Sequence, residues 1–171
     1  MAQAYIEKTV TIQGQPLHVV EAGQPGRQIA LLIHGWSSSW YALSPLIGLL
    51  AQRFHCLAVD LPGYGQSPPL NKPTTIPCYA DLLAELIETV SDGPVVVVGH
   101  SMGGMISIRL ALHYPLLIER MVLLSPTISG HLSKAINIFI SPITLMERFR
   151  PGSLLVTAVE RTIVGLTDRL M

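Results

Sequence analysis

One serine in the chain stands in surroundings that suit covalent chemistry. Ser101 is the third residue of Gly99-His-Ser-Met-Gly103, a G-x-S-x-G pentapeptide. The four valines at 95–98 predict a strand buried on both faces, and the apolar residues after the pentapeptide follow helical spacing. A turn of this kind exposes the serine hydroxyl at its apex and leaves no room for a β-carbon at Gly99 or Gly103. We therefore interpret Ser101 as a candidate nucleophile and expect its backbone to be strained.

The helix predicted after Ser101 adds an electrostatic argument. The free N–H groups at a helix N-terminus, together with the positive end of the helix dipole, stabilise an anion that forms there. A second interpretation stays open at this point, in which the turn is an ordinary strand–helix connection and the serine only caps the helix. The other elements of the chain are needed to weigh the two.

The stretches around this turn predict a sheet whose strands alternate with helices. Residues 5–12 and 17–22 alternate polar and apolar side chains around Gly14-Gln15-Pro16, which indicates an antiparallel hairpin. Four continuous apolar runs predict buried strands, at 29–33, 56–59, 95–98 and 121–124. Because helical patterns separate these strands, we expect an α/β fold with a mainly parallel sheet covered on both faces.

Two helices are predicted between the hairpin and the strand that leads to Ser101. The first begins with Ser44 as its capping residue and Pro45 in its first turn. Its expected apolar face consists of Leu46, Leu49, Leu50 and Phe54. The second helix has the clearest helical spacing in the chain, through Tyr79, Leu82, Leu83, Leu86, Ile87 and Val90.

Polar residues stand where the predicted strands end. His34, Asp60, Ser101 and Ser125 each follow one of the four apolar runs. Open α/β sheets carry their reactive groups at the carboxyl ends of the strands, so loops from neighbouring strands can share one pocket. This placement favours the chemical interpretation of Ser101 over the capping one.

Three motifs together resemble the serine α/β-hydrolase superfamily. They are His34-Gly35-Trp36, Asp60-x-Pro-Gly-Tyr-Gly-x-Ser67 and Gly99-His-Ser-Met-Gly-Gly104, in the family's order and after successive strands. The resemblance covers about residues 5–128 and implies an α/β-hydrolase-type sheet with an antiparallel N-terminal hairpin, incomplete on its C-terminal side. Residues 1–129 would then be the N-terminal part of the hydrolase core, and the apolar segments within 130–171 the start of a helical cap.

The resemblance also implies roles for single residues. Ser101 would be the nucleophile, and the backbone N–H groups of Met102 and Trp36 would form the oxyanion hole. Asp60 and Ser67 resemble structural loop residues of the family, not its catalytic acid. The turn that carries Ser101 corresponds to the family's nucleophile elbow. Members of the superfamily that open epoxides or cleave carbon–halogen bonds use aspartate at the elbow, so the serine favours chemistry on an ester or related acyl bond, through an acyl-enzyme.

The general base and its orienting acid are not evident. The superfamily places them after the nucleophile, in the order Ser, Asp or Glu, His. Of the later histidines, His113 ends the elbow helix, roughly 18 Å along its axis, and His131 follows no strand. Neither fits, and no strand precedes the later acids Glu119, Glu147, Glu160 and Asp168. We therefore expect the N-terminal part of a serine hydrolase, ended within the cap and inactive or weak as this chain.

Three other functions remain open from the sequence. The chain could be a non-catalytic binding or assembly module on an inherited scaffold, an acyltransferase, or one half of a site that a partner chain completes. In this chain by itself, the strand at 121–124 would lack a neighbour on its outer side. Since only 13% of residues are charged, we expect self-association through that edge, or its coverage by residues 131–170.

Composition excludes several classes of partner. The formal net charge is zero, so attraction to nucleic acid or to anionic membranes is not expected. Cys56 and Cys78 form no disulfide framework, no Cys/His spacing suggests a metal site, and no nucleotide-binding motif indicates a cofactor. With no signal peptide and no apolar run long enough for a membrane span, the cytoplasm is the expected location.

Overall fold

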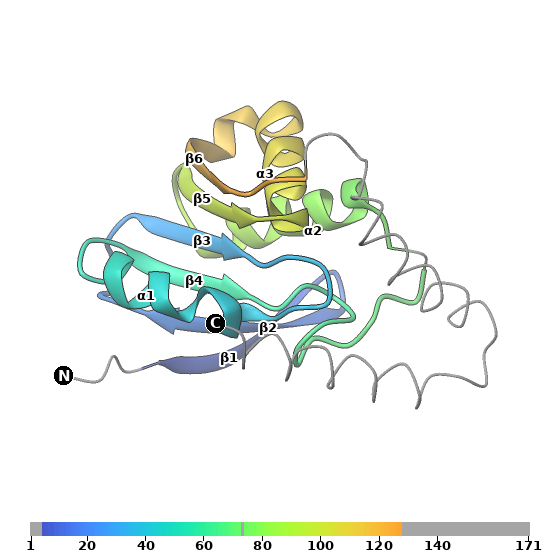
Figure 1. Ribbon diagram of the computed structural model, residues 1–171, viewed down its shortest axis with the longest axis horizontal. Coiled ribbons are helices and arrows are strands. Elements are labelled where there is room, and N and C mark those ends of the chain that lie inside the picture. Colours follow the sequence, from blue (N-terminus) through green and yellow to red (C-terminus); the bar gives the residue numbers. More distant parts are fainter. Residues whose placement is uncertain (1–4, 73, 128–171) are drawn as a thin grey trace. The chain divides into compact units, whose positions relative to one another are not determined.

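The computed structural model of the chain describes residues 5–72 and 74–127, which belong to the first of its two units, Met1–Ile128. Their centre is a six-stranded sheet in the order β1-β2-β4-β3-β5-β6 (Figure 1). Strands β3, β4, β5 and β6 run parallel, and the hairpin of β1 and β2 joins β4 antiparallel. The strands are β1 (Ile6–Ile12), β2 (Gln15–Ala22), β3 (Ile29–Ile33), β4 (His55–Val59), β5 (Val95–His100) and β6 (Ile118–Leu124). The predicted α/β fold with an antiparallel N-terminal hairpin is therefore confirmed.

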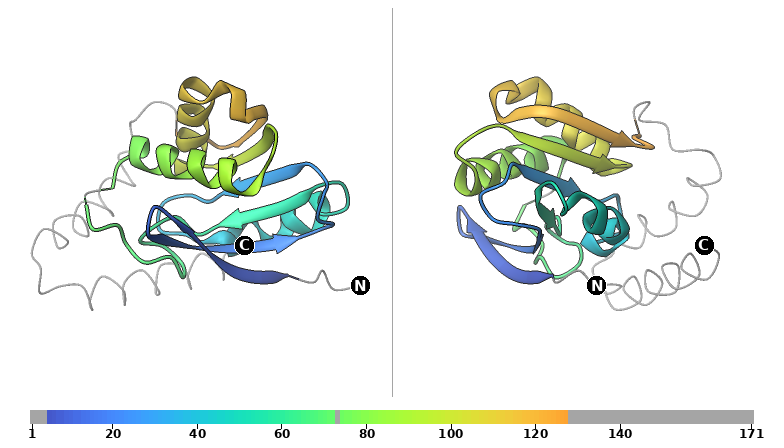
Figure 2. Two further views of the ribbon diagram at one scale, coloured as in Figure 1. Left: turned by 180° about the vertical axis from the view of Figure 1, so that it is seen from behind. Right: turned by 90° about the vertical axis from the view of Figure 1, so that its left-hand side faces the viewer.

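Helices cover the sheet on both faces (Figures 1 and 2). They are η1 (Trp40–Leu43), α1 (Ser44–Leu50), α2 (Ile76–Val90), α3 (Met102–His113) and η2 (Pro115–Leu117), where η marks a short 3₁₀ helix. Helix α1 packs on one face over a core that includes Val20, Leu32 and Ile47. Helices α2 and α3 pack on the other face over a larger core. Buried on both sides, β3 contains apolar residues alone, as its sequence run predicts.

The first predicted helix differs from expectation in its start and in its buried face. Ser44 is the first helical residue and does not cap α1; the capping side chain is that of Ser39, at the start of η1. Leu49, expected on the apolar face, is 67% exposed, whereas Ile47 is fully buried. The buried residues of η1 and α1 are Leu43, the last residue of η1, and Ile47 of α1, while Leu46 and Leu50 are only partly buried against the same core.

The apolar run of the last described strand predicted burial, whereas the family resemblance predicted that its outer side would lack a neighbour; the second prediction is confirmed. Strand β6 begins at Ile118, three residues before the predicted start, and Met121 and Val122 are 36% and 45% exposed. Among the described residues β6 pairs only with β5, so it forms one edge of the sheet. An edge strand lacks the neighbour that would bury its side chains, which explains the difference. The predicted cap segment, 130–171, lies outside the described residues.

Candidate active site

Ser101 occupies a strained backbone position between β5 and α3. Its φ and ψ are 52° and −114°, and α3 begins at the next residue, Met102. A β-carbon at Gly99 would overlap the Ser107 hydroxyl and would lie 2.5 Å from the Gly103 carbonyl oxygen. At Gly103 it would overlap the carbonyl oxygen of Ile33. The expected strain and both steric roles of the glycines are thus confirmed.

The segment that follows β6 holds the elbow in place. The backbone N–H of Ser101 donates to the Leu124 carbonyl (3.0 Å), and the Ser101 carbonyl accepts from the N–H of Thr127 (3.3 Å). The Ser101 and Thr127 hydroxyl oxygens lie 3.3 Å apart. Ser125 has a positive φ of 43° at the bend between these contacts. No sequence motif marks Thr127, and its place after the neighbouring strand is the only signal that could have pointed to it.

The loop after β3 passes directly beside the elbow. A β-carbon at Gly35 would lie 3.2 Å from the Ser101 β-carbon and 3.2 Å from Nδ1 of His100. Trp36, the next residue, is 39% exposed, and Ser37 has a positive φ of 52°. As the first residue of α3, Met102 has no intrahelical acceptor for its N–H. The loop carrying Trp36 and the N-terminus of α3 therefore meet at Ser101.

His34 is a structural residue of that loop. It is fully buried, its Nε2 accepts from the N–H of Leu61 (3.0 Å), and its Nδ1 donates to the carbonyl of Gly35 (2.7 Å). Both bonds require a neutral ring with its proton on Nδ1. Burial lowers the pKa of His34, although the Gly35 carbonyl and the charge of Asp60 partly oppose that shift. Because both ring nitrogens are used, His34 is not available as a base for Ser101.

Asp60 is likewise occupied by structural bonds, as expected. Its buried carboxylate accepts from the N–H of Trp40 (2.7 Å) and of Gln66 (2.9 Å), and from the ring of His18 (2.9 Å). The Ser67 hydroxyl donates to the Asp60 carbonyl (2.6 Å). The Asp60-to-Ser67 motif thus closes a loop around a buried carboxylate. The sequence analysis missed His18, whose role depends on strand pairing.

No histidine or carboxylate within residues 5–72 and 74–127 hydrogen-bonds to the Ser101 hydroxyl; its described partner is Thr127. His113 ends α3, at the far end of that helix from Ser101. Glu119 lies near the amino end of β6 and bonds to the Gln28 side chain. His131, Glu147, Glu160 and Asp168 lie outside the described residues.

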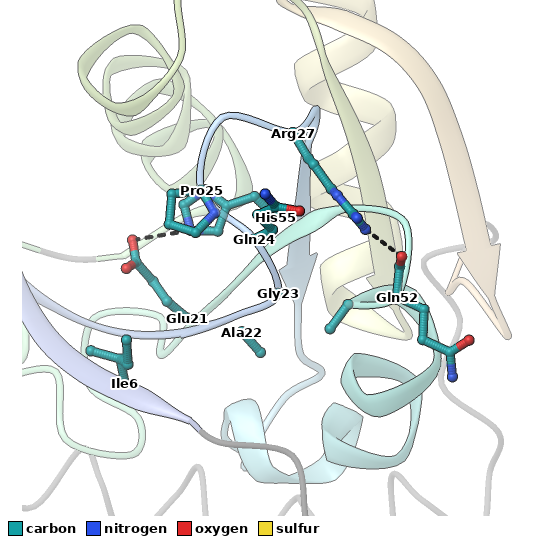
Figure 3. Close-up of a pocket in the computed structure, with 10 residues that line it drawn as sticks. Ile6, Glu21, Ala22, Gly23, Gln24, Pro25, Arg27, Gln52 and His55 are labelled. Atoms are coloured by element: carbon teal, nitrogen blue, oxygen red, sulfur yellow. Dashed lines mark hydrogen bonds and ion pairs between the residues drawn. The ribbon is translucent and has the colours of Figure 1, made fainter.

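A pocket of about 490 Å³ lies where β2 ends and β4 begins, at the amino ends of the parallel strands (Figure 3). Its walls include the last residue of β2, Ala22, and the first residue of β4, His55. Arg27 reaches across it to the carbonyl of Gln52, and Glu21 lies 3.7 Å from the His55 ring. Since Ser101 follows the carboxyl end of β5, which runs parallel to β3 and β4, this pocket does not belong to the elbow.

The described residues contain no group of three or more His, Cys, Asp or Glu side chains that could hold a metal ion. Cys56 is buried, which raises the pKa of its thiol to about 11, and neither it nor Cys78 forms a disulfide. No helix in the described ranges is both long and apolar enough to cross a membrane.

Comparison with known proteins extends these observations. Residues 30–169 match the Alpha/beta hydrolase family. The uncharacterized hydrolase YugF of Bacillus subtilis is 36% identical over 128 residues, which are 73% of this chain and 45% of that protein. The (E)-2-((N-methylformamido)methylene)succinate hydrolase of Acinetobacter baylyi is 33% identical over 70% of this chain and 45% of its own length.

A solved structure agrees with these relatives. The crystal structure of E-2-(acetamidomethylene)succinate hydrolase superposes with a TM-score of 0.65 and 34% identity, covering 69% of this chain and 43% of that one. The chain thus spans less than half the length of the curated relatives that it matches.

Proposed function

The chain belongs to the alpha/beta hydrolase family, and from this premise we propose that Ser101 is the nucleophile of a hydrolase that acts on an ester or related acyl bond. The observation that carries the proposal is the backbone of Ser101, held at a φ of 52° between β5 and α3. Strain of this size persists only where the surrounding structure enforces it, and it concentrates at functional sites. Here the glycines at 99 and 103 and the bonds to the β6 exit segment enforce it.

The proposed reaction proceeds through an acyl-enzyme. The Ser101 oxygen attacks the carbonyl carbon of the substrate, and its proton passes to a general base. The negative charge on the carbonyl oxygen is stabilised by the N–H groups of Met102 and Trp36. As this intermediate collapses, the base gives that proton to the leaving group, which departs, and the acyl group stays on Ser101. Water then attacks the acyl ester while the base takes a proton from it; the base passes this proton to the Ser101 oxygen as the acid is released.

The residue at the elbow supports one substrate class over another. Two relatives are named as hydrolases of a formamido- and an acetamido-substituted succinate. Others are named epoxide hydrolases, at 28% identity or below for the mouse and human epoxide hydrolase 4. We favour a small-molecule acyl substrate over an epoxide for this chain because serine, not aspartate, occupies position 101.

We further propose that residues 1–129 form the N-terminal part of the hydrolase core and that 130–171 begin its helical cap. Among the described residues no acid–histidine pair reaches Ser101, so we expect this 171-residue chain to react slowly. We also propose that it self-associates through the outer edge of β6, where Met121 and Val122 are exposed.

A serine-directed phosphonate probe tests the nucleophile. We expect slow labelling of the chain, confined to Ser101 on peptide mapping, accelerated by added imidazole as an external base and abolished in Ser101→Ala. Ser125→Ala is the matched control, because Ser125 also follows a strand and has a positive φ, and it should label like the wild type. Labelling that is spread over several serines, or that persists in Ser101→Ala, refutes the proposal. Rapid Ser101-dependent labelling would instead reveal an overlooked base, with His131 the first to substitute.

A further inference from the structure

His18 is a buried histidine that lies between two carboxylates. It belongs to β2, where Thr9 of β1 lies opposite it, and it is 6% exposed. Glu7 of β1 lies opposite Val20, which is two residues along β2 from His18. The side chains of Glu7 and His18 therefore lie on the same face of the hairpin. Asp60, directly after β4, donates its N–H to the His18 carbonyl (2.9 Å). The pairing of three strands thus assembles this group.

The hydrogen bonds of His18 indicate where its protons are. Its Nδ1 lies 2.9 Å from Oδ2 of Asp60, and its Nε2 lies 3.1 Å from Oε2 of Glu7. An ionised carboxylate only accepts hydrogen bonds, and a neutral imidazole has a single N–H. Both bonds therefore form together only when both ring nitrogens carry a proton. His34, where a backbone N–H donates to one nitrogen, shows the opposite, neutral pattern.

The charges around His18 agree with a cation at this position. The Asp60 side chain is 1% exposed, and a buried carboxylate is costly without a counter-charge. The neighbouring pair of Lys8 and Glu21 lies on the other face of the hairpin, by the alternation of side chains along a strand. Helix α1, which packs on the face of His18, contains no charged residue. The charged side chains that contact His18 within the described ranges are those of Glu7 and Asp60.

We propose that His18 is a buried imidazolium that positions the loop carrying Trp36. Two hydrogen bonds connect His18 to the loop. His18 donates to Oδ2 of Asp60, and Oδ1 of Asp60 accepts the N–H of Trp40 (2.7 Å), the residue at which the loop ends. The Ser67 hydroxyl accepts the N–H of His18 (2.8 Å) and donates to the Asp60 carbonyl, which ties the second loop to the same centre. The importance of the loop for catalysis rests on the proposed function; the charge of His18 does not.

Nitrogen-15 NMR of the histidine rings tests the charge. We expect two protonated ring nitrogens for His18, because each of its nitrogens lies against a carboxylate oxygen, and one for His34. In Glu7→Gln the new amide can donate to Nε2, so the ratio of charged to neutral His18 should fall about threefold or more. Glu85→Gln removes a carboxylate of α2 that accepts a hydrogen bond from Gln13, and this control should leave the charge of His18 unchanged. A neutral His18 in the wild type, or one unaffected by Glu7→Gln, overturns the proposal.

Amide hydrogen exchange tests the positioning role. His18→Asn keeps a donor near the place of Nδ1 but removes the charge, so the Trp40 N–H should exchange at least about tenfold faster while amides of β3 stay protected. Unchanged exchange at Trp40 would refute the coupling to the loop. Ser101→Ala should leave the His18 ring signals as they are, so a failure of the proposed nucleophile is distinguishable from a failure of this inference.

Discussion

The close approach at Gly103 makes a quantitative prediction about the elbow. In Gly103→Ala the new β-carbon would overlap the Ile33 carbonyl oxygen and lie 2.6 Å from that of His34. An ordinary contact is about 3.5 Å, so the second carbonyl alone would have to move by roughly 1 Å. Ile33 is the last residue of β3 and His34 comes directly after it. Strand β3 is paired with β4 on one side and with β5 on the other, so neither carbonyl can move freely. A side chain cannot rotate away to relieve the overlap.

The expected size follows from two opposing effects. Overpacking against backbone costs about 3 kcal/mol, whereas alanine in place of glycine within a helix contributes about 0.5–1 kcal/mol of stability. The free energy of unfolding of Gly103→Ala should therefore fall by about 2 kcal/mol. For a chain of this length, that lowers the melting temperature by about 4–8 °C.

Gly48→Ala is the matched control. Gly48 also lies in a helix, α1, but a β-carbon there would have no atom within 4 Å. The same substitution should therefore raise the free energy of unfolding by up to about 1 kcal/mol. Urea unfolding followed by circular dichroism measures both variants. A Gly103→Ala protein as stable as the wild type, or equal losses in the two variants, would refute the steric account of the elbow.

Two further predictions follow from His34 and from the sheet edge. Burial lowers the pKa of His34, so the folded state binds fewer protons at this site than the unfolded state; the free energy of unfolding should fall as the pH drops below about 6.5. Urea titrations at several pH values should show this loss diminished in His34→Gln, and an equal loss in both proteins contradicts it. Val122→Lys places a charge on the exposed edge strand β6 and should reduce self-association in sedimentation experiments. Leu112→Lys, on the exposed surface of α3, is the control and should leave self-association unchanged. A wild-type chain that is monomeric at every concentration rules out the edge as a contact.

Much of the fold could be predicted because local patterns carry it. The strand at 95–98 and helix α2 show their periodicity within a few residues, and the structure places both where the sequence indicated. The strained elbow was predictable for the same reason, since its glycines and serine are adjacent in the chain. Features that depend on one short stretch of the chain can therefore be predicted from the sequence.

The errors arose where burial depends on distant neighbours. Leu49 fits an apolar helical face, yet Ile47 is the residue of α1 that is fully buried in the core against the sheet. The apolar run of β6 by itself predicted a buried strand, but at the sheet edge, where the family resemblance placed it in this chain, Met121 and Val122 are exposed. Hydrophobic patterns report the preference of a side chain; its burial depends on what packs against it.

For the candidate site, the sequence by itself determined the nucleophile candidate, the glycines around it and the polar residues at the strand ends. Only the tertiary structure decided which of these groups meet. Strand pairing brings Glu7, His18 and Asp60 together across 53 residues of chain, and the exit of β6 brings Thr127 to Ser101. A hydrogen bond requires two groups within about 3 Å, and for residues far apart in the chain that distance is set by sheet order and register alone.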